Sequence, residues 1–141
     1  MSERIEHMNC ELIELPQLKN ENGNLTFIEE IEHYSFSVER AYWLYDIPAG
    51  ESRDGHAYKE LKEIIIALSG SFKVAVSDHN GKEMIYEMNR SSQALYVPSL
   101  TWRQIRSFST NSVVFILASL PYSEEDYIYD FDEFIQRRNC E

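Results

Sequence analysis

One histidine, one tyrosine and one glutamate lie at short spacings between two glycines of this chain. His56 follows Gly50 by six residues, Tyr58 lies two residues further on, and Glu63 precedes Gly70 by seven. An imidazole with a pKa of about 6.5 can accept and donate a proton near neutral pH, whereas a phenol with a pKa of about 10 mainly donates. The segment therefore combines side chains that suit acid/base proton transfer.

Metal chemistry needs more imidazoles than this pattern offers. The four histidines fall in four separate parts of the chain: the N-terminal segment, a turn, the glycine-bounded segment and a predicted hairpin tip, at His7, His33, His56 and His79. A protein metal site normally uses three or four N, O or S ligands supported by further contacts. We therefore expect no metal site.

Three arginines could bind a small phosphorylated ligand although the chain is acidic overall. A few guanidinium groups directed into a pocket can hold a diphosphate, and the candidates are Arg40, Arg53 and Arg103. Arg40 and Arg53 could instead form ordinary ion pairs with the abundant Asp and Glu. Trp102 has two interpretations: it packs as an anchor in the core or at the rim of the fold, or its ring stacks on a nucleotide base.

The elements that must position these residues are predicted to be short β-strands. Turn residues recur at close intervals, and the runs between them are rich in β-branched and aromatic residues. The predicted strands are Leu25–Ile31, Ser35–Tyr45, Glu63–Leu68, Ser71–Ser77, Glu83–Met88, Ala94–Val97, Trp102–Phe108 and Ser112–Leu120. About eight strands with tight turns predict an all-β fold, a small jelly-roll barrel whose interior can hold one ligand.

Hydrophobic patterning distinguishes the strands by their burial. Ser71–Ser77 alternates, so one face should be buried, whereas Ile64–Leu68 and Val113–Leu117 are continuously apolar and should be covered on both faces. Asp78–Gly81 reads as a hairpin tip. After the strands, Ser123 resembles a helix N-cap followed by acidic residues, which predicts a short C-terminal helix.

Length and charge limit the remaining possibilities. The 141 residues fit one domain, 1–141, and the net charge of -11 makes nucleic acid and anionic membranes poor partners. The N-terminal segment lacks an apolar run, so we expect neither a signal peptide nor a membrane span, and a cytoplasmic location. Cys10 and Cys140 give no disulfide framework and are interpreted as free thiols.

The spacing of the glycine-bounded segment resembles the first motif of the cupin fold. The pattern is Gly50, five residues, His56-Ala57-Tyr58, four residues, Glu63, six residues and Gly70. In metal cupins a second histidine stands where this chain has Tyr58, and a later motif supplies another where this chain has Arg103. The fold that the resemblance implies is a cupin jelly-roll barrel, without the imidazoles of a metal-binding cupin.

A closer resemblance joins these residues to one cupin family. The segments Arg53–Lys59 and Ile66–Ser71 resemble the Arg-Gly-x-His-Ala-His-Lys and Leu-Ser-Gly-Ser elements of the sugar-nucleotide 3,4-ketoisomerases. Further segments agree in order, at Arg40–Asp46, Leu95–Pro98, Trp102, Leu117–Ser119 and Asp126–Phe134. The match runs from about Asn22 to Phe134, the expected core of the domain.

The resemblance implies a function. Members of that family are dimeric cupins that use no metal or cofactor and convert dTDP-4-keto-6-deoxyglucose into a 3-keto sugar in deoxysugar biosynthesis. The reaction moves a proton from C3 to C4 through an enediol. On this resemblance His56 is the catalytic base, Tyr42 assists proton transfer as a donor, and Arg40 binds phosphate or a keto oxygen. Tyr58 stands where the family has a histidine, and its phenol could serve as a second donor. The expected partners are a dTDP-linked substrate and a second copy of the chain.

Two departures from the family pattern keep alternatives open. Tyr58 replaces the second motif histidine, and Asn22 stands where the family has an arginine. A barrel with these changes could be a non-catalytic sugar-nucleotide-binding module. A related sugar-nucleotide epimerase is a third possibility, because it also begins with proton abstraction beside a keto group. His56 could also be a core residue, and Tyr42 and Tyr58 could fill the barrel.

Overall fold

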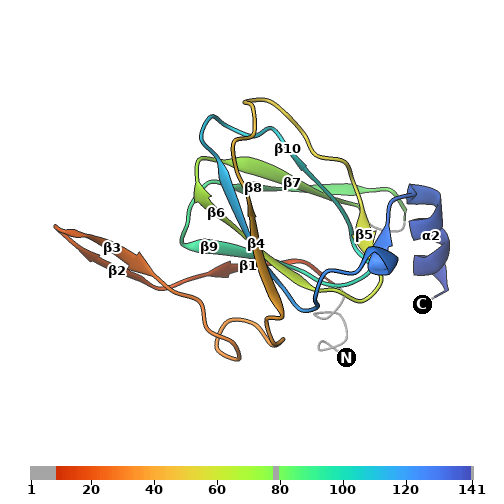
Figure 1. Ribbon diagram of the computed structural model, residues 1–141, viewed down its shortest axis with the longest axis horizontal. Coiled ribbons are helices and arrows are strands. Elements are labelled where there is room, and N and C mark those ends of the chain that lie inside the picture. Colours follow the sequence, from red (N-terminus) through yellow and green to blue (C-terminus); the bar gives the residue numbers. More distant parts are fainter. Residues whose placement is uncertain (1–8, 78–79, 141) are drawn as a thin grey trace.

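The computed structural model describes residues 9–77 and 80–140 of the chain. Most of the regular structure is β-strand, as predicted, with a 3-10 turn and one α-helix near the C-terminus (Figure 1). The strands are β1 (Glu11–Glu14), β2 (Gln17–Asn20), β3 (Gly23–Thr26), β4 (Arg40–Leu44), β5 (Ala57–Tyr58), β6 (Glu63–Ser69), β7 (Phe72–Ser77), β8 (Glu83–Met88), β9 (Gln93–Val97), β10 (Trp102–Arg106), β11 (Val113–Ala118) and β12 (Tyr127–Ile128).

Two antiparallel sheets form the body of the molecule. The larger has the strand order β1-β9-β6-β11-β4, and the smaller has the order β10-β7-β8. They face one another in Figure 1, and the short pair β12-β5 lies at one end of the space between them. This arrangement agrees with the predicted cupin jelly roll.

The main hydrophobic core lies between the two sheets. The larger sheet contributes Ile65, Leu95 and Val114, and the smaller contributes Phe72 and Val74; all five side chains are buried. The predicted alternation of β7 is confirmed only in its first half, where Phe72 and Val74 are buried while Lys73 is exposed; further along, Ala75 and Ser77 on the other face are buried as well. Burial of this apolar surface from both sheets fixes the strands that surround the cavity described below.

A second apolar cluster covers the outer face of the larger sheet. Ile64, Ile66 and Leu117 point to that face and contact Phe36, which belongs to the segment between β3 and β4. The continuously apolar sequences of β6 and β11 are thereby explained, since successive residues enter opposite cores. The predicted long strands 25–31 and 35–45 are wrong in extent, because most of their residues form this covering segment.

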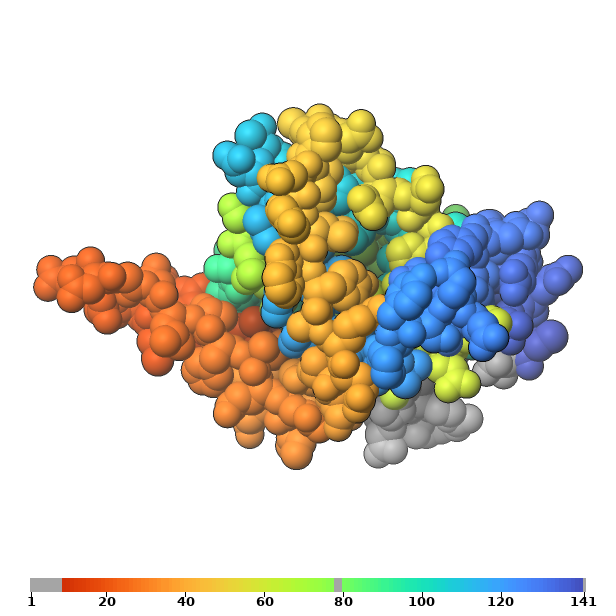
Figure 2. Space-filling view, viewed as in Figure 1, coloured from red at the N-terminus to blue at the C-terminus, as the bar shows by residue number. Residues whose placement is uncertain are grey.

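Strands β2 and β3 form a hairpin that projects away from the sheets (Figures 1 and 2). Its turn falls at Glu21-Asn22, where turn residues predicted one, and Gly23 adopts a positive φ of 140°. The sequence analysis missed β1 and β2. All four residues of β2 are exposed, so no buried face imposes an apolar alternation on its sequence.

The C-terminal segment forms a helix, but later than predicted. Ser123 makes no side-chain capping bond, and Glu124–Asp126 form only a 3-10 turn. Strand β12 follows, and helix α2 (Phe131–Asn139) begins after Asp130, whose carboxylate accepts a hydrogen bond from the Asp132 backbone N–H at 3.1 Å. The predicted start at Ser123 was wrong because Tyr127 and Ile128 pair with β5 as a β-strand and therefore cannot belong to the helix.

Some predictions fall outside the described residues or concern single side chains. His7 and His79 lie outside the described residues, and so does half of the expected hairpin tip at 78–81. The antiparallel pairing of β7 with β8, which this tip connects, is described. Cys10 and Cys140 are both free thiols, as expected. No helix among the described residues is long and apolar enough to cross a bilayer.

Candidate active site

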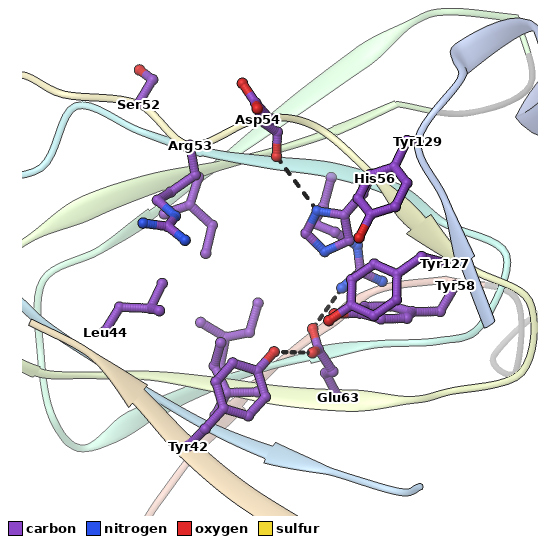
Figure 3. A pocket seen from close by; sticks show the side chains of 14 residues that line it. Tyr42, Leu44, Ser52, Arg53, Asp54, His56, Tyr58, Glu63, Tyr127 and Tyr129 are labelled. Carbon is purple, nitrogen blue, oxygen red and sulfur yellow. Dashed lines mark hydrogen bonds and ion pairs between the residues drawn. The ribbon is translucent and has the colours of Figure 1, made fainter. Parts of the chain in front are cut away.

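A cavity of about 560 Å³ opens between the two sheets, beside the β12-β5 pair. Its walls come from strands β4, β5, β6, β10 and β11, from residues 52–56, and from Tyr127 and Tyr129. Its size falls within the range of small-molecule sites, roughly 300–1,000 Å³. Figure 3 shows the polar side chains that converge there.

His56 lies in the cavity wall directly before β5. Its backbone N–H donates to the Arg103 carbonyl oxygen at 3.0 Å, and the Arg103 N–H donates to the His56 carbonyl oxygen at 2.9 Å. The ring nitrogen Nδ1 lies 3.4 Å from the Asp54 carbonyl oxygen (Figure 3). Burial, followed by the positive charges of Arg103 and Arg53, lowers the pKa of His56 to about 4. The imidazole is therefore neutral at pH 7 and can accept a proton.

Glu63 joins two other polar groups of the cavity. Its Oε2 accepts a hydrogen bond from the Tyr42 hydroxyl at 2.5 Å, and its Oε1 pairs with Arg103 Nη1 at 2.5 Å (Figure 3). Both members of the ion pair are fully buried, at 2% and 1% exposed. Arg103 Nη2 is also buried and has no hydrogen-bond partner among the described residues, so it can still donate to a ligand oxygen.

Sheet register explains why Tyr42 and Glu63 meet. Tyr42 on β4 is opposite Ile116 on β11, and Ile116 is opposite Ile65 on β6. Glu63 lies two residues from Ile65 and therefore on the same, inward face of its strand. Burial, and then the charge of the Glu63 carboxylate, raise the pKa of Tyr42 far above its usual value.

Tyr58 occupies the floor of the cavity and is only 1% exposed. Its ring is edge-on to His56, with the centroids 5.0 Å apart, and packs on Tyr127 at 4.6 Å. The Arg103 guanidinium lies 5.0 Å from the centroid of the Tyr58 ring, so the phenol also supports the buried ion pair. Desolvation, and then the nearby Glu63 charge, raise the pKa of Tyr58 strongly, so that it stays protonated at neutral pH.

The predicted substrate-binding residues occupy different positions. Arg53 and Arg103 line the cavity, but Arg40 and Trp102 are not among the described residues that do so. Arg40 lies over the ring of Tyr42, with its guanidinium carbon 4.8 Å from the centroid. Trp102 packs edge-on against Phe131 of helix α2, at 5.2 Å, as the anchor alternative anticipated.

Sequence reasoning left several residues of the cavity wall without a role, among them Glu63, Tyr127 and Tyr129. Glu63 was noted only for its spacing in the motif, yet a charged residue inside an otherwise apolar strand is an indication that it has a buried partner. Tyr127 was read as part of a helix. Its position on β12, antiparallel to Tyr58, brings it into the cavity wall.

The side chains present do not make a metal centre. Within residues 9–77 and 80–140, no group of three or more His, Cys, Asp or Glu side chains is arranged to hold a metal ion. The groups beside His56 are instead the phenol of Tyr58 and the guanidinium of Arg103. A cation at that place would be opposed by the positive charge of Arg103.

Comparisons with known proteins show which proteins this chain is similar to. The chain is 35% identical over 129 residues to the TDP-4-oxo-6-deoxy-alpha-D-glucose-3,4-oxoisomerase of Aneurinibacillus thermoaerophilus, covering 90% of this chain and 91% of that one. It also resembles the crystal structure of a 3,4-ketoisomerase from Helicobacter canadensis, with a TM-score of 0.88 and 29% identity, over 94% of this chain and 99% of that chain.

A third similar protein is a sugar 3,4-ketoisomerase from Thermoanaerobacterium thermosaccharolyticum, solved in complex with TDP. The TM-score is 0.89 and the identity is 32%, over 94% of this chain and 96% of that chain. The model of the family described as FdtA, WxcM-like, C-terminal, matches residues 8–139. The resemblance read from the motifs is thereby confirmed, and the chain belongs to the WxcM-like, C-terminal (FdtA) family.

Proposed function

We propose that this protein is a 3,4-ketoisomerase of a TDP-linked 4-keto-6-deoxyhexose and acts in deoxysugar biosynthesis. The single observation that carries the proposal is a half-buried, neutral imidazole, His56, whose backbone is bridged to that of Arg103 in the wall of a cavity of ligand size. The relatives named above support the substrate class, because one acts on TDP-4-oxo-6-deoxyglucose and another binds TDP.

In the proposed reaction His56 removes the proton from C3 of the sugar. A C–H bond next to a keto group becomes acidic enough only when the developing negative charge on the oxygen is stabilised. Arg103 Nη2 is the donor available for this oxygen, since it is buried and without a hydrogen-bond partner among the described residues. The imidazolium then gives the proton to C4, and the low pKa of His56 favours this release.

Substrate binding divides between the remaining polar groups. Arg53 lines the cavity and is exposed, so it is suited to bind the diphosphate. The roles of Arg40 and Trp102 as substrate ligands stay predictions. Because neither lines the cavity, they would contact only parts of the nucleotide that lie outside it. Tyr58 stays a proposed donor. Its pKa favours retention of its proton, in agreement with that role.

A homodimer is part of the same proposal. Hairpin β2–β3 projects from the body and exposes Leu18 and Leu25, at 59% and 54%. Apolar side chains on a projecting hairpin are suited to contact a second copy. Light scattering after size-exclusion chromatography should therefore give twice the 16.6 kDa chain mass. The cytoplasmic location likewise stays a prediction.

The decisive experiment is incubation with TDP-4-keto-6-deoxyglucose in deuterated water. The wild-type protein should incorporate deuterium into the sugar ring and form a 3-keto product, and His56→Asn should do neither. Calorimetric titration with TDP tests the non-catalytic module, which would bind TDP without turnover. Analysis of the product tests the epimerase, which would change a configuration of the sugar and leave its keto group at C4.

A further inference from the structure

The carboxylate of Glu63 is buried in the cavity wall, and the proposed reaction assigns it no part. We propose that Glu63 is a positioning residue that prepares the hydroxyl of Tyr42 to carry the substrate's hydroxyl proton from the C3 oxygen to the C4 oxygen. The inference rests on the proposed ketoisomerase function.

The reaction requires two hydrogens to move. The substrate has a hydroxyl on C3 and a keto group on C4, and the product has the reverse. His56 moves the hydrogen bound to carbon, from C3 to C4. The hydrogen bound to oxygen must also leave the C3 oxygen and reach the C4 oxygen, and this transfer needs a group that contacts both oxygens.

Tyr42 has the geometry for this second transfer. Its side chain lines the cavity, and its hydroxyl is fixed by a 2.5 Å hydrogen bond to Glu63 Oε2 (Figure 3). Because a phenol has one proton, the proton lies toward Glu63, and the Tyr42 oxygen keeps a lone pair that can accept from the substrate. The Tyr42 hydroxyl can thus accept the hydrogen of the C3 hydroxyl.

Glu63 can hold this orientation because it is itself fixed. Its other oxygen is paired with Arg103 at 2.5 Å, and the carboxylate is 2% exposed. A buried carboxylate with a paired guanidinium is costly to displace, so the Tyr42 hydroxyl has one orientation before substrate binds. The guanidinium also offsets the carboxylate charge, so that the cavity can still accommodate a negative enediolate.

The transfer balances without any further reactant. After His56 removes the C3 hydrogen, the enediolate has its negative charge on the C4 oxygen and a hydrogen on the C3 oxygen. Tyr42 accepts the proton of the C3 oxygen while its own proton moves along the hydrogen bond to Glu63 Oε2, and the reverse shift then gives a proton to the C4 oxygen, so that Tyr42 ends as a neutral phenol and Glu63 as a carboxylate. Burial and the Glu63 charge raise the pKa of Tyr42, so a free phenolate does not accumulate.

Isotope exchange separates the two hydrogen transfers. In deuterated water we would measure, by NMR, deuterium at C3 of recovered substrate and the formation of 3-keto product. Tyr42→Phe and Glu63→Gln should lose product formation by about 100-fold, the usual contribution of a general acid/base group, while exchange at C3 falls far less. The enediolate then returns to substrate, so the ratio of exchange to isomerisation rises. His56→Asn should lose both.

Controls make the result decisive. Tyr86→Phe removes a phenol that lies outside this cavity and should leave the ratio unchanged. Tyr42→Phe keeps the Glu63–Arg103 pair, so it carries the test even if Glu63→Gln does not fold. Equal loss of exchange and product in Tyr42→Phe would overturn the inference. A wild-type protein that shows neither exchange nor product would instead refute the proposed function.

Discussion

The backbones of His56 and Arg103 are joined by two reciprocal hydrogen bonds, with N···O distances of 3.0 and 2.9 Å. This bridge lies outside the regular ladders, between the residue before β5 and strand β10. It places an imidazole and a guanidinium side by side in the cavity wall. The proximity has a measurable electrostatic consequence, because the Arg103 charge disfavours a second positive charge on His56.

The first prediction concerns the pH dependence of activity. The base form of His56 is the neutral imidazole, and its pKa is lowered to about 4. The acid limb of kcat/KM should therefore fall as pH drops through about 4, well below the value of about 6.5 for an ordinary imidazole. Initial rates between pH 3.5 and 8 would measure this.

His33→Asn provides the control for this profile, since His33 is not among the described residues that line the cavity. An acid limb centred at about 6.5 in the wild-type protein would show that burial and Arg103 do not act on the catalytic base as described.

The second prediction follows from the same pKa but concerns stability. The unfolded chain protonates His56 near its usual pKa of about 6.5, whereas the folded protein resists protonation down to about 4. Between these values the unfolded state binds more protons, so the contribution of His56 to stability is full above pH 6.5 and is lost as pH falls. At pH 5 the loss amounts to about 2 kcal/mol.

Urea unfolding of the wild-type protein and His56→Asn at pH 5 and pH 8 would check this. The difference in unfolding free energy between the two proteins should change with pH by about 2 kcal/mol in favour of the variant at pH 5. Parallel curves at both pH values would contradict the prediction.

The fold was predictable where local sequence and burial agree. Strand β7 alternates over Phe72–Val74 because one face is in the core, and β6 is apolar over Ile64–Ala67 because both faces are covered there. Leu68, which was also predicted to be covered, is 50% exposed. The two-residue strands β5 and β12 were not predictable, since their pairing is decided by a contact between positions 57–58 and 127–128. Such contacts depend on the closed fold and leave no periodic pattern in either segment.

The site was predictable residue by residue but not as an assembly. His56 and Tyr58 could be selected because they lie in one motif. The contacts of Glu63 with Tyr42 and Arg103 span 21 and 40 positions and exist only because β4 and β6 flank β11 while β10 crosses the cavity. Residue types indicated the chemistry, and sheet register determined which groups meet.

The third prediction tests the role of Trp102. Its indole packs against Phe131 and Phe134 of helix α2, and it also covers Gly55, where an added Cβ would lie 2.8 Å from the indole Nε1. Trp102→Ala should therefore lower the unfolding free energy by about 3 kcal/mol, as loss of a large packed aromatic does. An unchanged dissociation constant for TDP in calorimetry would assign Trp102 to packing alone.

Two further variants sharpen this test. Gly55→Ala should also destabilise the protein, because the methyl group displaces the indole. Trp43→Ala is the matched control, since this tryptophan is 55% exposed and its removal should cost less than about 1 kcal/mol. Weakened TDP binding by Trp102→Ala, without loss of stability, would instead support the base-stacking role.

The last prediction separates catalysis from packing at Tyr58. The ring is buried against His56, Tyr127 and the Arg103 guanidinium, and these contacts do not need the hydroxyl. The hydroxyl itself acts on Tyr42: burial and Glu63 raise the pKa of Tyr42, and the interaction with the Tyr58 hydroxyl partly opposes them. Tyr58→Phe should therefore fold with nearly wild-type stability while kcat falls by about three- to tenfold, the value of one neutral hydrogen bond.

Thermal unfolding and steady-state kinetics on the same preparations would measure both effects, with Tyr86→Phe as the control for loss of a phenol elsewhere. An unchanged kcat in Tyr58→Phe would make Tyr58 a packing residue only. A larger loss, near that of Tyr42→Phe, would mean that the phenol at this position has taken over the proton transfer of the imidazole that the family pattern has there.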